Sequence, residues 1–353
     1  MNERINDDDG PGAWVPEGKY VWDTWFAKDK TDKLHAFYLQ ADKEACRFDP
    51  ERRHNIASVG HAFFDNGEWR QQGETPALAA EPDGWDNISI WTGSIIYDDL
   101  TDLFYMFYTS RNRREISINT PRGVFPPQQI GLASSPDLKN WSRLEKTRQG
   151  PVIQNPSPQF GLDGVNWRDP YVLKVDSNYH CLISARRSSS NSIADDAGGT
   201  IVLLSSNQLL DWKSPTVRIV AGSDDFYQME VPQLFCKISK ERKRYYLIFC
   251  AQAIDCSKKR RERVCQEDCQ TGTYYICSDE LAIEDTEIPM FSGEAKMLRR
   301  NLYAGKIVEY CGKTVLFGFD YQGGEASFKG GIAGPWMVSF SNDGTIEVSE
   351  ESA

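Results

Sequence analysis

The sequence predicts an all-β protein: a five-bladed β-propeller whose four-stranded antiparallel blades surround a central funnel. Two observations lead to this fold class. Short runs of alternating apolar and polar residues, rich in aromatic and β-branched side chains, occupy most of the chain, and they recur in the same order. Such alternation is typical of strands, and periodic four-stranded units are typical of propellers.

Each predicted unit opens with a short strand that begins near a polar or acidic residue. The openings lie at VWDTWF (21–26), WTGSIIYDD (91–99), WRDPYVLKVD (167–176), MEVPQLFCKIS (229–239) and LYAGKIVEYCG (302–312). The starts at Thr92, Arg168, Met229 and Leu302 are separated by 76, 61 and 73 residues. Intervals of this length accommodate four short strands, so the sequence predicts five blades.

A second strand follows each opening and is predicted to be half-buried, because its apolar residues alternate with others. These strands are LHAFYLQ (34–40), LFYMFYTS (103–110), YHCLISAR (179–186), RYYLIFCAQ (244–252) and TVLFGFD (314–320). Third and fourth strands are clearest at 131–141 and 202–212, where small residues lead into a turn and a Trp. The last copy, 335–348, contains an Asp-Gly hairpin signal.

Two stretches are predicted to be inserted loops. Residues 111–128 are rich in charge, Pro and Gly, and residues 254–272 carry a basic run typical of a solvated loop. No linker or change of composition marks a second domain. We therefore expect an N-terminal extension over 1–18 and a single propeller domain over 19–350.

Composition and charge argue against several classes of function. A net charge of -11 disfavours nucleic acid and anionic membrane as partners, and no apolar run is long enough to span a membrane. The start of the chain lacks the apolar core of a secretory signal, and nine cysteines favour free thiols in the cytoplasm. No metal-ligand spacing, nucleotide-binding loop or serine-nucleophile motif is present, so no cofactor or metal is expected. Nothing indicates an oligomeric state.

Three carboxylates stand at the openings of separate units: Asp23, Asp169 and Glu230. Inner strands of a propeller converge on its channel, so these side chains are expected to face one another. Taken singly, each acid is explained better as a turn former, a cap or a strand-edge charge. Together they suit glycosidic cleavage, which needs an ionised nucleophile, a protonated acid and a group that stabilises the transition state.

Four motifs in order give the sequence a family resemblance. VWDTWF resembles the nucleophile segment of family 68 levansucrases, and WRDP (167–170) is similar to the Arg-Asp-Pro motif of glycoside hydrolase families 32 and 68. MEVP (229–232) resembles the family 32 acid/base segment, with Val231 where Cys is usual. WTGS (91–94) is similar to a Trp-Ser-Gly-Ser stretch of the same clan.

The resemblance implies individual roles on a five-bladed propeller. Asp23 would be the nucleophile, Asp169 the transition-state stabiliser and Glu230 the general acid/base of a retaining β-fructofuranosidase or fructosyltransferase. Its partner would be a small sugar or oligosaccharide. The predicted substrate-binding residues are Trp22, Trp25, Gln40, Trp91, Ser94, Arg168 and Tyr303.

The sequence also departs from the clan pattern and leaves other functions open. It lacks the Asn-Asp-Pro-Asn-Gly motif of ordinary invertases, and no segment corresponds to a C-terminal β-sandwich. A family 43-like glycosidase acting on another furanoside or a pyranoside is one alternative. A propeller that binds a glycan or metabolite without cleaving it is another.

Overall fold

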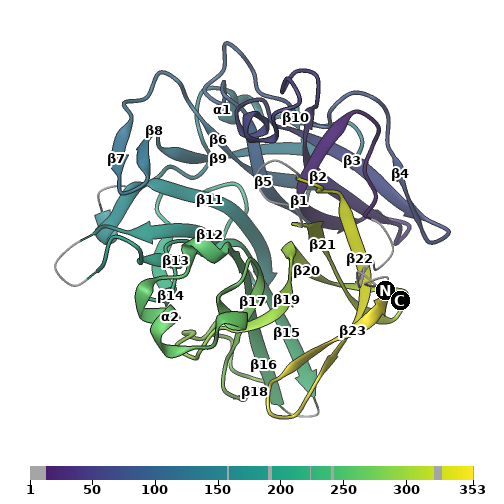
Figure 1. The fold of residues 1–353 in the computed structure, drawn as a ribbon. Helices are drawn as coiled ribbons and strands as arrows, with labels where there is room; N and C mark the ends of the chain where they lie inside the picture. Colours follow the sequence, from purple (N-terminus) through teal and green to yellow (C-terminus); the bar gives the residue numbers. More distant parts are fainter. Residues whose placement is uncertain are drawn as a thin grey trace, which may run out of the picture.

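The computed structural model describes residues 13–156, 159–189, 193–222, 224–239, 242–321 and 328–352. Five antiparallel sheets surround a centre in this part of the chain (Figure 1). Within each sheet, neighbouring strands follow chain order, and the first strand lies innermost. The prediction of an all-β, five-bladed propeller with four-stranded blades is confirmed.

The blades follow one another along the chain, four strands at a time. Blade 1 contains β1 (Lys19–Lys28), β2 (Leu34–Asp42), β3 (Ser58–Asp65) and β4 (Glu68–Gln71). Blade 2 contains β5 (Ile90–Asp98), β6 (Leu103–Arg111), β9 (Gln128–Ser135) and β10 (Ser142–Arg143). Blade 3 contains β11 (Leu162–Val175), β12 (Asn178–Arg187), β13 (Gly199–Ser206) and β14 (Thr216–Gly222).

The last two blades complete the ring. Blade 4 contains β15 (Glu230–Ser239), β16 (Arg242–Ala251), β17 (Gly272–Cys277) and β19 (Lys296–Arg300), with the short β18 (Leu281–Ala282) also paired to β16. Blade 5 contains β20 (Leu302–Tyr310), β21 (Lys313–Asp320), β22 (Ile332–Phe340) and β23 (Ile346–Ser352).

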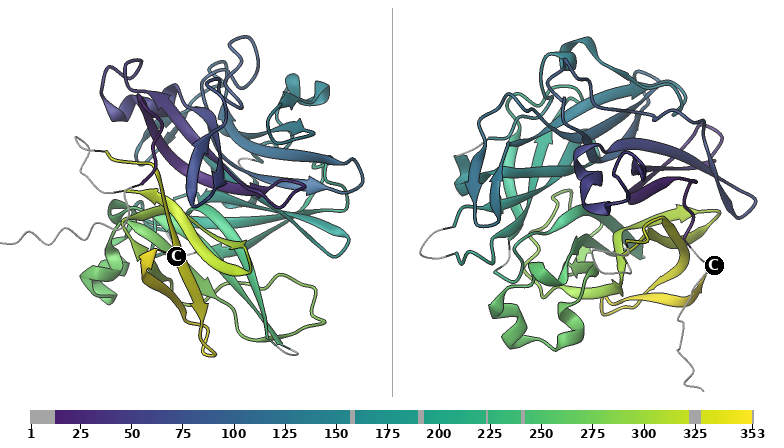
Figure 2. Two further views of the ribbon diagram at one scale, coloured as in Figure 1. Left: turned by 90° about the vertical axis from the view of Figure 1, so that its right-hand side faces the viewer. Right: turned by 45° about the horizontal axis from the view of Figure 1, so that its top comes forward.

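The predicted insertions are not featureless. Residues 111–128 include a separate hairpin of β7 (Ile118–Thr120) and β8 (Gly123–Phe125). Residues 254–272 include the short helix α2 (Lys258–Arg263), which stands out from the body in Figure 2. The other helical segments are equally brief: η1 (Pro50–Asn55), α1 (Glu145–Arg148), η2 (Gln159–Gly161), η3 (Ala253–Asp255) and η4 (Gln266–Cys269). Among the described residues, no helix has the length and apolar character needed to cross a membrane.

The hydrophobic core is divided among the interfaces between neighbouring blades. Because a blade packs against a neighbour on each face, its second strand is buried on both sides. Strand β2 is buried from Leu34 to Ala41, and β6 from Phe104 to Arg111. The prediction of half-buried second strands was therefore wrong: their nearly continuous apolar runs indicate strands covered on both faces.

The ring closes where blade 5 meets blade 1. Val21 and Tyr38 of blade 1 belong to the same buried cluster as Phe317 of blade 5. Ahead of β1, Trp14 exchanges backbone hydrogen bonds of 2.9 and 2.8 Å with Ile332 of β22. The predicted extension 1–18 thus contributes to closure through Trp14, whereas residues 1–12 lie outside the described part of the chain. Closure brings β1 beside β20, and the site is built between these inner strands.

Candidate active site

Every innermost strand carries a β-bulge at the same depth in the funnel. The pairing register with the second strand shifts at Trp22/Thr24, Trp91/Gly93, Arg168/Tyr171, Glu230/Gln233 and Tyr303/Lys306. Bulges occur where a strand must redirect a side chain, and they often lie beside active sites. The repeated irregularity therefore marks the functional level of the propeller.

The bulges arrange the site residues in two rings. One ring holds the residue before each bulge: Trp22, Trp91, Arg168, Glu230 and Tyr303. The other holds the first bulged residue: Asp23, Thr92, Asp169, Val231 and Ala304. Sequence reasoning treated the three carboxylates as equivalent, but Glu230 belongs to the first ring and the two aspartates to the second.

Left-handed backbone conformations accompany this arrangement. Asp23 has a φ of 36° and Asp169 a φ of 57°, values uncommon for residues other than glycine. Val231 and Ala304 lie in the same region, both with φ of 51°. Such conformations cost free energy, which the surrounding blades must offset. Their recurrence at one level indicates that the direction of these side chains matters more than the local backbone preference.

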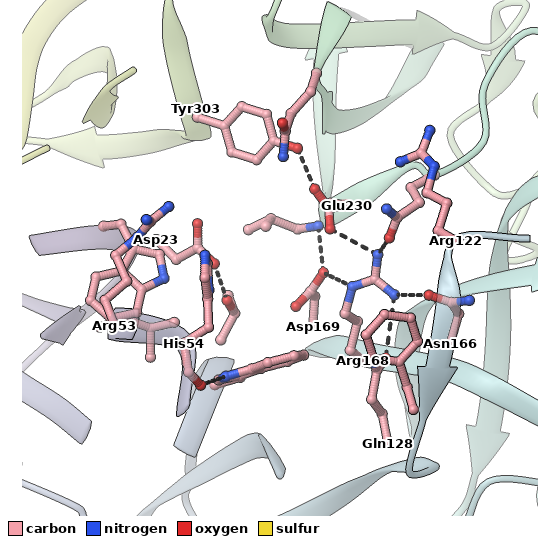
Figure 3. A pocket seen from close by; sticks show the side chains of 18 of the residues that line it. Asp23, Arg53, His54, Arg122, Gln128, Asn166, Arg168, Asp169, Glu230 and Tyr303 are labelled. Carbon is pink, nitrogen blue, oxygen red and sulfur yellow. Dashed lines mark hydrogen bonds and ion pairs between the residues drawn. The ribbon is translucent and has the colours of Figure 1, made fainter. Parts of the chain in front are cut away.

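The two rings surround a cavity of about 380 Å³. Asp23, Asp169 and Glu230 all line it, although they come from blades 1, 3 and 4. Figure 3 shows Asp23 on one side of this space and Glu230 on the other, with Asp169 between them. The cavity lining also includes the predicted residues Trp22, Trp91, Arg168 and Tyr303.

Threonines of blade 2 support the two aspartates. Thr92 donates its hydroxyl to Asp23 Oδ2. Thr109 Oγ1 donates to the Thr92 carbonyl at 3.0 Å and accepts from the Asp169 backbone N–H at 2.8 Å. Asp169 Oδ2 also accepts from the backbone N–H of Val231 at 3.0 Å. The carboxylates are thus held by a hydrogen-bond network that spans blades 1 to 4.

Both oxygens of Glu230 have partners within the funnel. Arg168 Nη2 lies 2.8 Å from Glu230 Oε1, and the Tyr303 hydroxyl donates to Oε2. Arg168 also approaches Asp169 Oδ2 with its Nε, at 3.6 Å, and donates to Asn166 Oδ1 at 2.6 Å (Figure 3). A guanidinium contacts the two carboxylates through separate nitrogens held in one rigid plane, a geometry that the single ammonium of lysine lacks.

Burial and mutual repulsion perturb the acids. Burial, followed by the charge of Asp169, raises the pKa of Asp23 to about 7. Burial also raises the pKa of Asp169 to about 6, against the opposing effect of Arg168. Strongly perturbed carboxyl groups that line a cavity are typical of catalytic sites, where burial and like charges shift their pKa values.

A buried cation, Lys306, interacts electrostatically with Asp23 and Asp169. Lys306 Nζ donates to the carbonyls of Val231 and Pro232 at 2.7 and 3.1 Å, so it braces the bulge that follows Glu230. Burial lowers the pKa of Lys306 to about 8. The described residues contain no group of three or more His, Cys, Asp or Glu side chains placed to hold a metal ion.

Three predicted substrate-binding residues do not line the cavity. Trp25 is buried in the core and stacks on Phe37 with ring centroids 6.4 Å apart. Gln40 is buried on β2, the second strand of its blade. Ser94 Oγ accepts from the Val172 backbone N–H at 3.0 Å and thereby joins blades 2 and 3. Each lies beyond the bulge or off the inner strand, where side chains meet the neighbouring blade.

Other cavity residues come from loops and were not predicted. Arg53 and His54 belong to η1, Arg122 and Phe125 to the β7–β8 hairpin, and Gln252 lies between β16 and η3. The sequence contained a signal for η1, since Asp49-Pro50 is a typical helix start and Asp49 caps it. No comparable signal marked the loops' positions over the funnel.

A family model matches most of the chain. The model described as "Glycosyl hydrolases family 32 N-terminal domain" matches residues 29–309, a range that contains Asp169 and Glu230 and begins after Asp23. A sucrose-6-phosphate hydrolase of Lactococcus lactis subsp. lactis is 26% identical over 233 residues, or 64% of this chain. The chain spans 40% of the length of that relative.

Solved structures show the same fold at low sequence identity. A GH32 β-fructofuranosidase of Bombyx mori has a TM-score of 0.62 at 18% identity, covering 94% of this chain and 64% of that one. An inulosucrase from Halalkalicoccus jeotgali bound to kestose has a TM-score of 0.67 at 16% identity, covering 97% and 91%.

Proposed function

Because the chain belongs to glycosyl hydrolase family 32, we propose that it is a retaining glycosidase that cleaves β-fructofuranosides such as sucrose. One observation carries the proposal: three carboxylates from separate blades face a single cavity. In the proposed reaction, Asp23 attacks the anomeric carbon of the fructosyl unit while Glu230 protonates the departing oxygen. Water, or an acceptor sugar in a transferase, then displaces Asp23 with Glu230 acting as base.

The proposed roles require a particular distribution of protons. Asp23 must be ionised to attack, yet burial raises its pKa to about 7, and the Tyr303 hydroxyl donates to Glu230 in the free protein. Only the ionised form of Asp23 can attack, so burial and the negative charge of Asp169 oppose formation of the reactive state. Glu230 must instead supply the proton that the departing oxygen receives.

The raised pKa of Asp23 predicts a specific pH dependence. Because Asp23 must be ionised to attack, kcat/KM for sucrose is expected to rise by about tenfold per pH unit below pH 7 and to level off above it. Initial rates between pH 4 and 9, taken over a range of buffers, would measure it. A value of kcat/KM that is already level at pH 5 would contradict the raised pKa of the nucleophile.

The charges around the cavity favour a neutral substrate. Arg53 lies 3.2 Å from Glu51, Arg122 lies 2.5 Å from Asp255, and Arg168 lies 2.8 Å from Glu230. Each guanidinium in the cavity lining thus already has an acidic partner, with which a phosphate group would compete. We propose sucrose and related neutral fructosides as substrates, although the bacterial relative is named for the phosphorylated sugar.

Product analysis across a substrate panel tests the function. The protein should release fructose from sucrose and raffinose, and release it more slowly from sucrose 6-phosphate, with glucose and fructose assayed separately. Glucose in excess of fructose would indicate transfer rather than hydrolysis. Turnover of nitrophenyl arabinosides or xylosides, with none of any fructoside, would favour a family 43-like specificity. Binding of sugars without turnover would leave only the non-catalytic alternative.

A further inference from the structure

The β7–β8 hairpin belongs to none of the blades. It leaves blade 2 between β6 and β9, and its residue Arg122 contacts blade 4. Arg122 Nη1 lies 2.5 Å from Asp255 Oδ1, and Nη2 donates to the Ile254 carbonyl at 3.2 Å. The same guanidinium stacks on the Tyr227 ring, 3.7 Å from its centroid. One side chain therefore attaches an inserted hairpin to the other side of blade 3.

The attachment is stronger than an ordinary surface ion pair. Asp255 is fully buried, and its second oxygen accepts from the Gln252 backbone N–H at 3.0 Å. A buried carboxylate that loses its cation is strongly destabilised, so Arg122 is held firmly. A two-stranded hairpin has little stability of its own, and Val124 and Phe125 are exposed. Strand β7 lies against β11 of blade 3, and Arg122 supplies the attachment of the hairpin to the blade 4 insertion.

The hairpin forms one wall of the catalytic cavity. Thr120, Arg122 and Phe125 all contribute to the lining. In Figure 3, Arg122 lies on the far side of Glu230 from Asp23. Under the proposed mechanism, the fructosyl unit is next to Asp23 and the leaving group is next to Glu230. The wall therefore borders the space that the leaving group must occupy.

We propose that the anchored β7–β8 hairpin determines substrate size, by closing the leaving-group end of the cavity so that short fructosides are preferred over long fructan chains. Arg122 is the positioning residue of this wall, and it acts through the hairpin rather than on the reacting atoms. This inference rests on the proposed function. A leaving group of one or two sugar units would contact the wall, whereas the remainder of a long chain would collide with it.

The test compares Arg122→Ala with the native protein on sucrose and on inulin. We expect the ratio of kcat/KM for sucrose to kcat/KM for inulin to fall by about tenfold. A tenfold change corresponds to a loss of roughly 1.4 kcal/mol in the free energy by which the protein discriminates between the two substrates. Because the single variant leaves Asp255 buried without its cation, Arg122→Ala/Asp255→Asn is measured beside it. Arg114→Ala, an exposed residue of the same insertion, is the matched control and should leave the ratio unchanged.

The outcomes separate the two proposals. A native protein that releases fructose from neither sugar contradicts the proposed function. A native protein that is active, with the same sucrose-to-inulin ratio in both Arg122 variants and normal thermal unfolding, overturns the role of the hairpin. An equal loss on both substrates would also overturn it, because a general defect does not discriminate by length.

Discussion

Replacing Asp23 by Asn is expected to lower kcat/KM for sucrose on the order of 10⁴-fold or more, the scale for loss of a covalent nucleophile. Asn has nearly the same size and can still accept the Thr92 hydroxyl, so the substitution removes charge and nucleophilicity rather than shape. Steady-state rates with a coupled glucose assay would measure the loss. Retention of more than a few per cent of native activity would contradict the role of Asp23.

The same variant has an independent signature in its stability. In the native protein, the pKa of Asp23 is raised from 3.8 to about 7, so ionisation of Asp23 costs folding free energy. That cost is absent below about pH 4, grows between pH 4 and 7, and is complete above pH 7. The amide of the variant does not ionise at any of these pH values. Urea unfolding of Asp23→Asn should therefore give a free energy of unfolding larger by about 2–4 kcal/mol at pH 8.

A matched measurement at low pH distinguishes this effect from a change in packing. At pH 4 the native Asp23 is protonated in the folded state, so the stability difference between the two proteins should nearly vanish. A variant that is less stable than the native protein at pH 8 would show that Asp23 is not held under electrostatic strain. The combination of lower activity and higher stability is typical of catalytic residues.

Replacing Glu230 by Gln is expected to reduce kcat/KM for sucrose by about 10²–10⁴-fold, the usual contribution of a general acid. The amide can still accept from Tyr303 and so preserves the shape of the cavity, but it cannot protonate the leaving oxygen. An aryl β-fructofuranoside with a good leaving group needs less protonation. For the aryl substrate, Glu230→Gln should therefore lower the rate of the first step, transfer of the fructosyl unit to Asp23, much less than it lowers the rate with sucrose.

Single-turnover measurements on both substrates examine this difference. Gln228→Ala is a suitable control, because Gln228 also contacts Arg168 and lines the cavity but has no acidic proton. Its losses should be similar for the two substrates. If Glu230→Gln lowered both first-step rates equally, the residue would be acting through Arg168 and not as the acid.

The propeller fold and the positions of the three carboxylates were predictable because both follow from short, local sequence patterns. Five strand openings recur along the chain, and Asp23, Asp169 and Glu230 stand within them. The bulges left a trace as well: Pro170 and Pro232 follow bulged residues, and Gly93 follows Thr92 where a Cβ would collide with the Phe107 carbonyl. Without the pairing register, these residues do not separate the two rings.

The remainder depended on contacts between distant segments. Arg122 and Asp255 are 133 residues apart and lie in two separate insertions, and only the folded ring brings them together. The positions of Trp25 and Ser94 outside the cavity lining have a related cause. Both residues lie just after a bulge in an inner strand. Side chains along a strand alternate between its two faces, and the extra residue of a bulge reverses this alternation for the residues that follow it. The bulge therefore decides whether a side chain faces the funnel or the next blade.

The residues in the two rings of bulge positions can change during evolution without a change in the fold. Their ten side chains project at, or next to, an interruption of the strand ladder, so exchanging one alters few of the backbone pairings that hold a blade together. Arg168, Glu230 and Tyr303 occupy the same position in three consecutive blades, yet they carry a cation, an acid and a phenol. Duplicated blades can diverge at such positions one substitution at a time. A propeller built in this way can acquire a new substrate while its architecture remains unchanged.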